Sequence, residues 1–244
     1  MKKTEKIEKI YEGKAKIIYS TDDPDLLIQY FKDSATAFNA KKKGTIQNKG
    51  ILNNKISSII FKFLEERGIR THFVERLDDR EMLIKRLKII PVEVVVRNIA
   101  AGSLSSRMGI EEGRPLKDTV LEFYYKSDKL GDPMINEYHI KAFDLSSPED
   151  IKKITESALE INRHLVEFFD NRGIRLVDLK LEFGHRVYSD ENNGEILLGD
   201  EITPDGSRLW DKETEKRLDK DRFRRDLGGV EEAYQEIYER VSRS

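Results

Sequence analysis

The sequence contains no cysteine, which excludes disulfide bonds, thiol catalysis and cysteine-ligated metal centres. It also has no apolar run long enough to span a membrane, and its first residues lack the apolar stretch of a secretory signal peptide. We therefore expect a cytoplasmic protein without a membrane partner.

The sequence also lacks an excess of charge of either sign. Its 44 basic and 46 acidic residues give a formal net charge of -2, and they are spread along the chain. No basic patch for nucleic acid is evident, so any phosphate ligand is expected to be small. With 244 residues, 38% hydrophobic and 37% charged, the chain is typical of a globular protein that buries a substantial core.

Several catalytic signatures are missing. The sequence has no serine or cysteine nucleophile motif and no Walker A loop. Its four histidines lack zinc-ligand spacing; they are His72, His139, His164 and His185. Catalysis by positioning, by lysines and by a bound metal ion is the mode that these absences leave.

Apolar periodicity predicts helices and strands in irregular order. Helices are predicted over 22–31, 52–67, 104–108, 148–172 and 231–242, and strands over 71–77, 89–96, 121–125 and 176–184. In the first segment, 10–19, an apolar strand is predicted after Lys16. Because strands and helices do not alternate regularly, we expect an α+β fold rather than a doubly wound parallel sheet. We expect a lobe boundary near Arg86–Lys88, which gives an N-terminal nucleotide-binding lobe over 1–87 and a second lobe over 88–244 with substrate and metal sites.

The segment from Leu176 to Gly184 alternates polar and apolar residues with period two. Asp178, Lys180 and Glu182 therefore leave one face of the expected strand. If this strand pairs with the segment 199–210 through a turn at 189–194, Glu182 falls opposite Asp200 or Glu201. Opposed carboxylates repel, and a magnesium ion with nucleotide phosphates would turn them into a ligand pair. The alternative is a solvated charged hairpin.

Two further segments contain groups that suit phosphates. Lys14 and Lys16 are two residues apart, so on a strand they would point to one side, and Gly13 permits close approach of a polyphosphate. Exposed strands also carry such lysines, so this pattern alone does not decide between a phosphate site and a solvated strand.

The segment from Arg97 to Ser103 follows the end of a buried strand. Gly102 permits close approach, Ser103 is expected to cap a helical turn, and free amides with Arg97 would form an anion site. Arg208 could add a second guanidinium. A plain strand-to-helix turn explains the Gly-Ser pair as well.

Two long segments, 89–103 and 176–184, resemble the signature segments of the SAICAR synthetase family, the phosphoribosylaminoimidazole-succinocarboxamide synthases. The segments 11–16, 33–39 and 200–205 also resemble family segments, and all five stand in the family's order. The resemblance implies a two-lobed fold related to ATP-grasp and kinase nucleotide-binding lobes. It also implies an ATP-dependent ligase of purine biosynthesis that joins L-aspartate to carboxyaminoimidazole ribonucleotide (CAIR).

The resemblance further implies residue roles and partners. By this resemblance, the residues that would bind ATP are Gly13, Lys14, Ala15, Lys16 and Lys126, and the ligands of Mg²⁺ would be Glu182 and Asp200. The residues that would bind the ribonucleotide are Arg97, Gly102, Ser103, Asp132 and Arg208. The reaction centre would be lined by Asp178 and Lys180. We expect a homo-oligomer, a dimer. From the residues alone, a small-molecule kinase and a non-catalytic nucleotide-binding regulator remain as alternatives.

Overall fold

The computed structural model describes residues 4–37, 42–188 and 195–243. The predicted turn at 189–194, and Phe38 and Asn39 of the 33–39 segment, lie outside this description. No helix within the described residues is both long and apolar enough to cross a membrane.

An antiparallel sheet of five strands forms the smaller lobe, in the order β1-β2-β3-β7-β6. Its strands are β1 (Lys6–Glu12), β2 (Lys16–Thr21), β3 (Leu26–Phe31), β6 (Phe73–Arg76) and β7 (Glu81–Lys85). A separate two-stranded ribbon consists of β4 (Ser34–Ala37) and β5 (Lys42–Thr45).

A second antiparallel sheet forms the larger lobe, in the order β10-β9-β8-β11-β12, and a further strand, β13, also pairs with β11. Its strands are β8 (Leu87–Ile99), β9 (Pro115–Tyr125), β10 (Met134–Ile135), β11 (Ile174–Arg186), β12 (Ile196–Leu198) and β13 (Ser207–Asp211). The two 13-residue strands β8 and β11 pair along most of their length, so β11 lies in the middle of the sheet.

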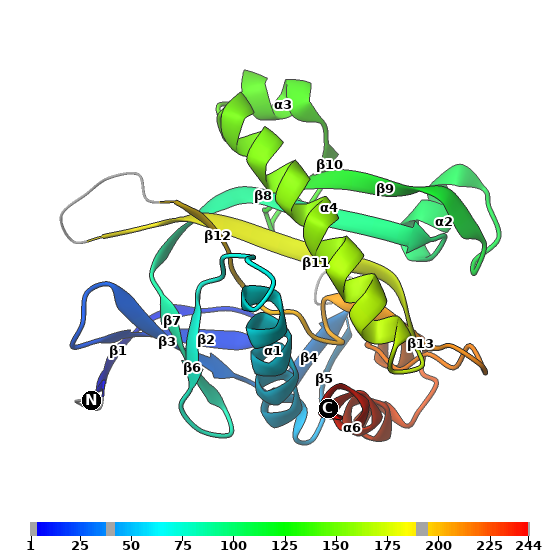
Figure 1. Cartoon of the computed structure of the whole chain (residues 1–244), viewed down its shortest axis with the longest axis horizontal. Helices are drawn as coiled ribbons and strands as arrows, with labels where there is room; N and C mark the ends of the chain where they lie inside the picture. The colour runs from blue at the N-terminus through cyan, green and yellow to red at the C-terminus, as the bar shows by residue number, and fades with distance from the viewer. Residues whose placement is uncertain (1–3, 38–41, 189–194, 244) are drawn as a thin grey trace.

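The helices of the described chain are α1 (Lys49–Glu65), α2 (Gly102–Met108), α3 (Glu137–Ala142), α4 (Pro148–Asp170), α5 (Asp221–Arg224) and α6 (Val230–Val241). Helix α4 begins as predicted, with Pro148 in its first turn and the Ser147 side chain accepting a hydrogen bond from the Asp150 N–H. It crosses β8 and β11 and covers one face of the larger sheet (Figure 1).

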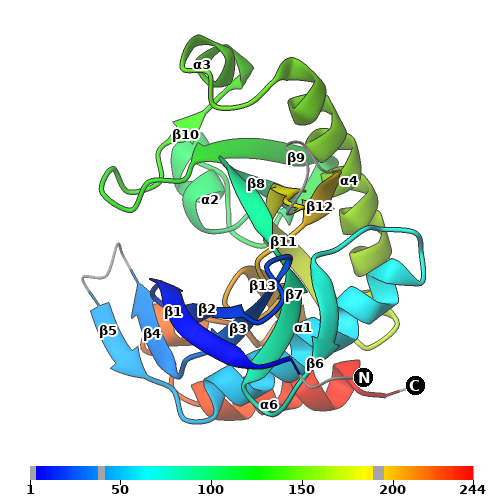
Figure 2. The same ribbon diagram turned by 90° about the vertical axis from the view of Figure 1, so that its left-hand side faces the viewer.

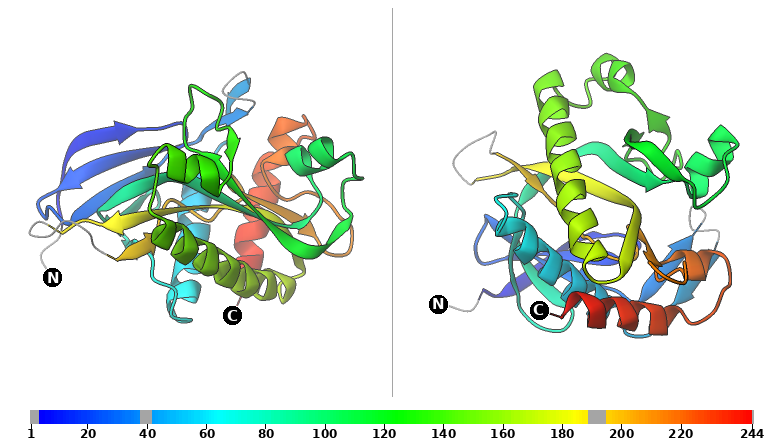
Figure 3. Two further views of the ribbon diagram at one scale, coloured as in Figure 1. Left: turned by 90° about the horizontal axis from the view of Figure 1, so that it is seen from above. Right: turned by 45° about the vertical axis from the view of Figure 1, so that its right-hand side comes forward.

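The C-terminal helix α6 returns to the smaller lobe, where it packs beside α1 (Figure 2). The described chain therefore begins with β1 and ends after α6 on the same side of the molecule (Figure 3). One continuous cluster of buried residues includes Phe31 and Ile60 of the smaller lobe and Leu165 and Leu179 of the larger lobe. The lobes therefore share a core, and the boundary proposed at residues 87 and 88 stays a prediction.

Two local predictions were wrong. Residues 26–31 form the strand β3 rather than a helix, because they lie between β2 and β7 and are largely buried. A strand covered on both faces shows the same continuous apolar pattern as a buried helix. The strand predicted after Lys16 is present as β2, but Lys14 and Lys16 do not share a strand face. Gly13, Lys14 and Ala15 form the connection between β1 and β2, and the Gly13 N–H donates to the Lys16 carbonyl at 2.9 Å.

His72 gives the folded state a testable pH dependence. Its ring is 2% exposed and lies 5.2 Å from the Phe61 ring, and its Nε2 has no hydrogen-bond partner within the described residues. Burial, with the charges of Lys16 and Lys85, lowers the pKa of His72 from 6.5 to about 3. The folded state therefore resists a proton that the unfolded state accepts below pH 6.5.

We expect the His72→Phe variant to lose this dependence, since phenylalanine keeps the ring contact and needs no proton. Between about pH 6 and pH 4 the free energy of unfolding of the unsubstituted protein should fall by about 1.4 kcal/mol per pH unit more than that of the variant. Denaturant unfolding at several pH values measures both slopes. If the free energy of unfolding changed equally with pH in both proteins, this would show that His72 takes up a proton in the folded state.

Candidate functional site

The charged face of β11 is buried in the middle of the larger sheet. Asp178, Lys180 and Glu182 share one face as predicted, but Asp178 and Glu182 are only 4% exposed. Strand β8 places Arg97 opposite Asp178 and Glu93 opposite Glu182. The solvated-hairpin alternative is therefore wrong, and these charges must be compensated inside the protein.

The predicted pairing of Glu182 with Asp200 across a ladder was wrong in its register. Strand β12 pairs with residues 183–185 of β11 and β13 with residues 174–179, so a loop over 199–206 interrupts the strand between them. Asp200 lies in this loop with a φ of 60°, in the left-handed region. Glu93 takes the position across the ladder from Glu182, while Asp200 approaches from the loop.

Three carboxylates and three lysines form what we call the charged cluster: Glu93, Glu182, Asp200, Lys16, Lys126 and Lys180. The Lys180 Nζ contacts Glu182, lies 3.1 Å from Glu93 Oε1 and lies 3.5 Å from Asp200 Oδ2. Lys126 Nζ lies 2.6 Å from Glu182 Oε2. Lys16, at the start of β2, contacts Asp200 and lies 3.2 Å from Glu201 Oε1, which joins the two lobes.

The cluster shifts the protonation of its members in opposite directions. Burial alone would raise the pKa of Glu182, but the charges of Lys180, Lys126 and Lys16 outweigh it and hold that pKa below its usual range. Burial would lower the pKa of Lys180, yet Glu182 and Glu93 raise it above its usual range. Glu182 therefore stays ionised and Lys180 stays charged. Burial and the Glu182 charge raise the pKa of Glu93 despite Lys180.

The donor chemistry of the cluster fits a magnesium ion that shares its coordination with phosphates. Within the described residues, no three acidic or histidine side chains converge as a self-sufficient metal site. Mg²⁺ commonly takes one or two carboxylates together with substrate phosphates and water. Glu182 and Asp200 provide two such carboxylates, and both contact the same lysine.

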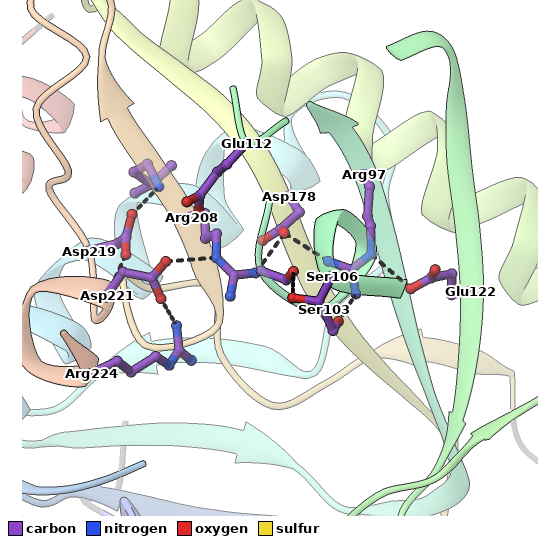
Figure 4. A network of polar contacts seen from close by, with 12 residues as sticks. Arg97, Ser103, Ser106, Glu112, Glu122, Asp178, Arg208, Asp219, Asp221 and Arg224 are labelled. Atoms are coloured by element: carbon purple, nitrogen blue, oxygen red, sulfur yellow. Dashed lines mark hydrogen bonds and ion pairs between the residues drawn. The ribbon is translucent and has the colours of Figure 1, made fainter. Parts of the chain in front are cut away.

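Figure 4 shows a network of arginines and carboxylates around Asp178. Asp178 lies on the same face of β11 as Lys180 and Glu182 of the charged cluster. Asp178 Oδ2 accepts hydrogen bonds from Arg97 Nη1 at 3.0 Å and from Arg208 Nη1 at 2.7 Å. Arg97, 3% exposed, also donates from Nε to Glu122 Oε2 at 2.8 Å and from Nη2 to Ser103 Oγ at 3.1 Å. Asp178 thus holds two guanidiniums side by side.

Gly102 and Ser103 both meet this network, although Ser103 does not cap α2 as predicted. The N-cap of α2 is Ala101, without a side-chain hydrogen bond, and Ser103 instead bonds Arg97. Gly102 has a φ of +53°, and a Cβ atom built there would lie 2.4 Å from Arg208 Nη2. The absence of a side chain at Gly102 therefore makes room for Arg208.

Two other predicted residues, Lys14 and Asp132, form contacts outside the charged cluster. Lys14 lies in the β1–β2 connection, so it does not share a strand face with Lys16, and its Nζ contacts Asp128 Oδ1 of the larger lobe at 2.6 Å. Asp132 accepts a hydrogen bond from the Ser127 N–H at 2.9 Å and closes the loop that carries Lys126.

The sequence reasoning missed three carboxylates that pair with cations inside the protein: Glu93, Asp205 and Asp221. Glu93 had a usable signal, since it is the one charged residue in the apolar run from Ile89 to Val96. Asp205 accepts hydrogen bonds from Lys49 Nζ at 2.6 Å and from the Tyr234 hydroxyl at 2.6 Å. These contacts join distant segments, which no local pattern indicates.

Fold and site together define a two-lobed α+β nucleotide-binding protein in which lysines and carboxylates meet where the lobes join. A model of the family described as SAICAR synthetase matches residues 9–241. The chain belongs to the SAICAR synthetase family.

Individual relatives agree with this assignment over almost their whole length. A phosphoribosylaminoimidazole-succinocarboxamide synthase of Caldanaerobacter subterraneus is 57% identical over 237 residues, which cover 97% of this chain and 98% of that protein. The crystal structure of the synthase from Ehrlichia chaffeensis has a TM-score of 0.93 and 52% identity, covering 96% of this chain and 98% of that one. A SAICAR synthetase in complex with ADP has a TM-score of 0.90 and 50% identity, covering 95% and 97%.

We expect Gly102→Ala to disturb the arginine network. A methyl group at this position meets the Arg208 guanidinium and is strained at positive φ, so Arg208 must move away from Asp178. The affinity for a phosphorylated ligand that binds Arg97 and Arg208 should fall at least about tenfold, while the free energy of unfolding falls by about 1–2 kcal/mol. Titration calorimetry and denaturant unfolding measure the two effects, with Gly109→Ala as control because it shares a positive φ but has no atom within 4 Å of its Cβ position. Equal losses in both variants would assign the effect to backbone strain alone.

Proposed function

We propose that the protein is an ATP-dependent carbon–nitrogen ligase of purine biosynthesis that joins L-aspartate to the carboxylate of CAIR, giving SAICAR, ADP and phosphate. One observation carries the proposal: the charged cluster and the arginine network lie next to each other on one face of β11. The cluster suits a magnesium-bound nucleotide and the network suits a phosphorylated second substrate. Family membership and the ADP complex of a relative support it.

The chemistry follows from this adjacency. The CAIR carboxylate attacks the γ-phosphorus of ATP, which gives an acyl phosphate and releases ADP. The amine of L-aspartate then attacks the acyl carbon, phosphate leaves, and the amine loses a proton. Lys16 and Lys180 would neutralise charge on the transferring phosphoryl group. Asp178 of the arginine network and Lys180 of the charged cluster are neighbours on one face of β11 and would line the reaction centre.

On the nucleotide side, Lys14 and Lys16, with the backbone of Gly13 and Ala15, would hold the phosphates of ATP. Lys126 would contact the nucleotide as well. Glu182 and Asp200 would hold Mg²⁺, which supplies charge neutralisation for the phosphates when bound. The contacts of Lys16 and Lys180 with Asp200 support this arrangement, because they bring phosphate-binding groups and metal ligands together.

On the ribonucleotide side, Arg97 and Arg208 would bind the monoester phosphate. Ser103 and the open backbone at Gly102 would complete this site, and Asp132 would approach the ribonucleotide from the 126–133 loop. Two guanidiniums held by one carboxylate give a rigid pair of donors, and the forked geometry of arginine matches a phosphate dianion.

We also expect a cytoplasmic homodimer. Tyr138 on α3 is 85% exposed and Phe143, directly after α3, is 71% exposed, and a second copy of the chain could cover these aromatic side chains. Light scattering after gel filtration measures the mass in solution. A monomer at micromolar concentration would contradict this expectation.

An assay for ADP release tests the proposed function against its alternatives. With ATP, Mg²⁺ and CAIR, sustained ADP release should require L-aspartate, and SAICAR should form in equal amount. A small-molecule kinase would instead release ADP and form a phosphorylated product without the amine. A non-catalytic regulator would gain thermal stability from ATP but turn over nothing. Either result would contradict the ligase.

The Glu182→Gln variant tests the metal assignment. Loss of an anionic metal ligand should lower kcat/KM for ATP on the order of a thousandfold and shift the dependence of the rate to higher Mg²⁺ concentration. Calorimetric titration of Mg²⁺ and ADP gives a second readout. Glu195→Gln is the matched control, because Glu195 precedes β12 and pairs with Arg70 away from the cluster. An unchanged Mg²⁺ dependence in Glu182→Gln would remove Glu182 from the metal site.

A further inference from the structure

Asp221 is a buried carboxylate that lies next to Arg208 (Figure 4). It is the first residue of the short helix α5 and is 1% exposed. Its Oδ2 accepts a hydrogen bond from Arg208 Nε at 2.9 Å, and its Oδ1 accepts one from Arg224 Nη1 at 2.6 Å. Burial would raise the pKa of Asp221, but the charges of Arg208 and Arg224 lower it, so the group stays ionised.

The backbone around Asp221 is fixed to the strand that carries Arg208. Asp219, which is fully buried, accepts a hydrogen bond from the Asp221 N–H at 2.7 Å and another from the Leu209 N–H at 2.8 Å. The Lys220 N–H donates to the Pro204 carbonyl at 3.1 Å. The carboxylate of Asp221 is therefore held at a fixed place relative to β13.

Arg208 uses its three nitrogens in three different directions. Its Nε binds Asp221 and its Nη1 binds Asp178, while Nη2 lies against Gly102 and has no hydrogen-bond partner within the described residues. If only Asp178 held the guanidinium, the plane could rotate about that single contact. The bond from Nε to Asp221 removes this freedom and fixes where Nη2 points.

We infer that Asp221 is a positioning residue, which orients Arg208 for the phosphate of the ribonucleotide without touching the ligand itself. The inference rests on the proposed role of Arg208 in phosphate binding. A donor that is already oriented loses less conformational freedom when the ligand binds, so the gain appears as affinity. Asp221 also adds a second anion to the arginine pair, which keeps Arg208 from being drawn toward Asp178 alone.

Titration calorimetry with SAICAR, and with its dephosphorylated nucleoside, tests this inference on the full chain. Asp221→Asn keeps the size of the side chain but removes its charge. It should weaken SAICAR binding about tenfold or more, the usual worth of a charged hydrogen bond, and leave the affinities for the nucleoside and for ADP within about twofold. In steady-state assays, KM for CAIR should rise while KM for ATP stays the same.

The control variant is Asp211→Asn, which removes another buried carboxylate of β13 that pairs with Arg240 away from the site. It should lower the melting temperature without changing the SAICAR affinity. If Asp221→Asn is too unstable to titrate, Asp221→Glu keeps the charge but displaces the carboxylate by one methylene, and the same selective loss is expected.

A double-mutant cycle separates the inference from the proposed function. In an Arg208→Lys background, which has no Nε–H fork to orient, Asp221→Asn should cost less than about twofold in SAICAR affinity. An equal cost in both backgrounds, or an equal loss of ADP affinity, would overturn the positioning role. If Arg208→Lys weakens SAICAR binding and Asp221→Asn does not, the inference fails while the proposed site stands. If Arg208→Lys itself leaves SAICAR binding unchanged, the proposed site fails and the inference fails with it.

Discussion

The structure depends on the burial of a charged face at the centre of a β-sheet. Asp178, Lys180 and Glu182 project from β11, which has β8 on one edge and β12 and β13 on the other. Isolated charges in such a place would cost several kcal/mol each, so each must face opposite charge. Arg97 and Arg208 compensate Asp178, while Lys126 and Lys180 compensate Glu182. The two ends of one strand thus require two different cationic sites.

A second buried carboxylate keeps the interrupting loop in place. Asp205 ends the segment that carries Asp200, and it is held by Lys49 at the start of α1 and by Tyr234 of α6. Burial would raise the pKa of Asp205, but Lys220 and Lys49 hold it below its usual range. Because α1 packs on the smaller sheet and α6 packs beside α1, these bonds fix the loop over 199–206 against the elements of the smaller sheet. The position of Asp200 next to Lys16 follows from this anchoring.

Local patterns predicted those parts of the site that one strand determines by itself. Period-two alternation placed Asp178, Lys180 and Glu182 on one face, and the apolar run from Ile89 to Val96 predicted the buried strand β8 but not its pairing with β11. The partners across the sheet could not be read in the same way, because register depends on the interrupted strand β12–β13 and on a loop conformation at Asp200. For the same reason Glu93, rather than Asp200, proved to lie opposite Glu182. The helix wrongly predicted over 22–31 failed because burial on both faces of β3 removed the alternation that distinguishes a strand.

The carboxylates of the charged cluster are paired with lysines before any ligand binds, and this pairing affects how a metal ion and a nucleotide would bind. Glu182 and Asp200 already contact Lys180, so a magnesium ion that binds both must share them with that lysine or replace it. Glu93 Oε1 lies 3.1 Å from the same ammonium group, and Glu93 is not one of the two proposed metal ligands. It can therefore keep Lys180 compensated while the other two carboxylates turn to a metal. In the proposed function, a site with three carboxylates and three lysines would accept a metal ion and a polyphosphate together, because the protein already holds groups of opposite charge for both ligands in place.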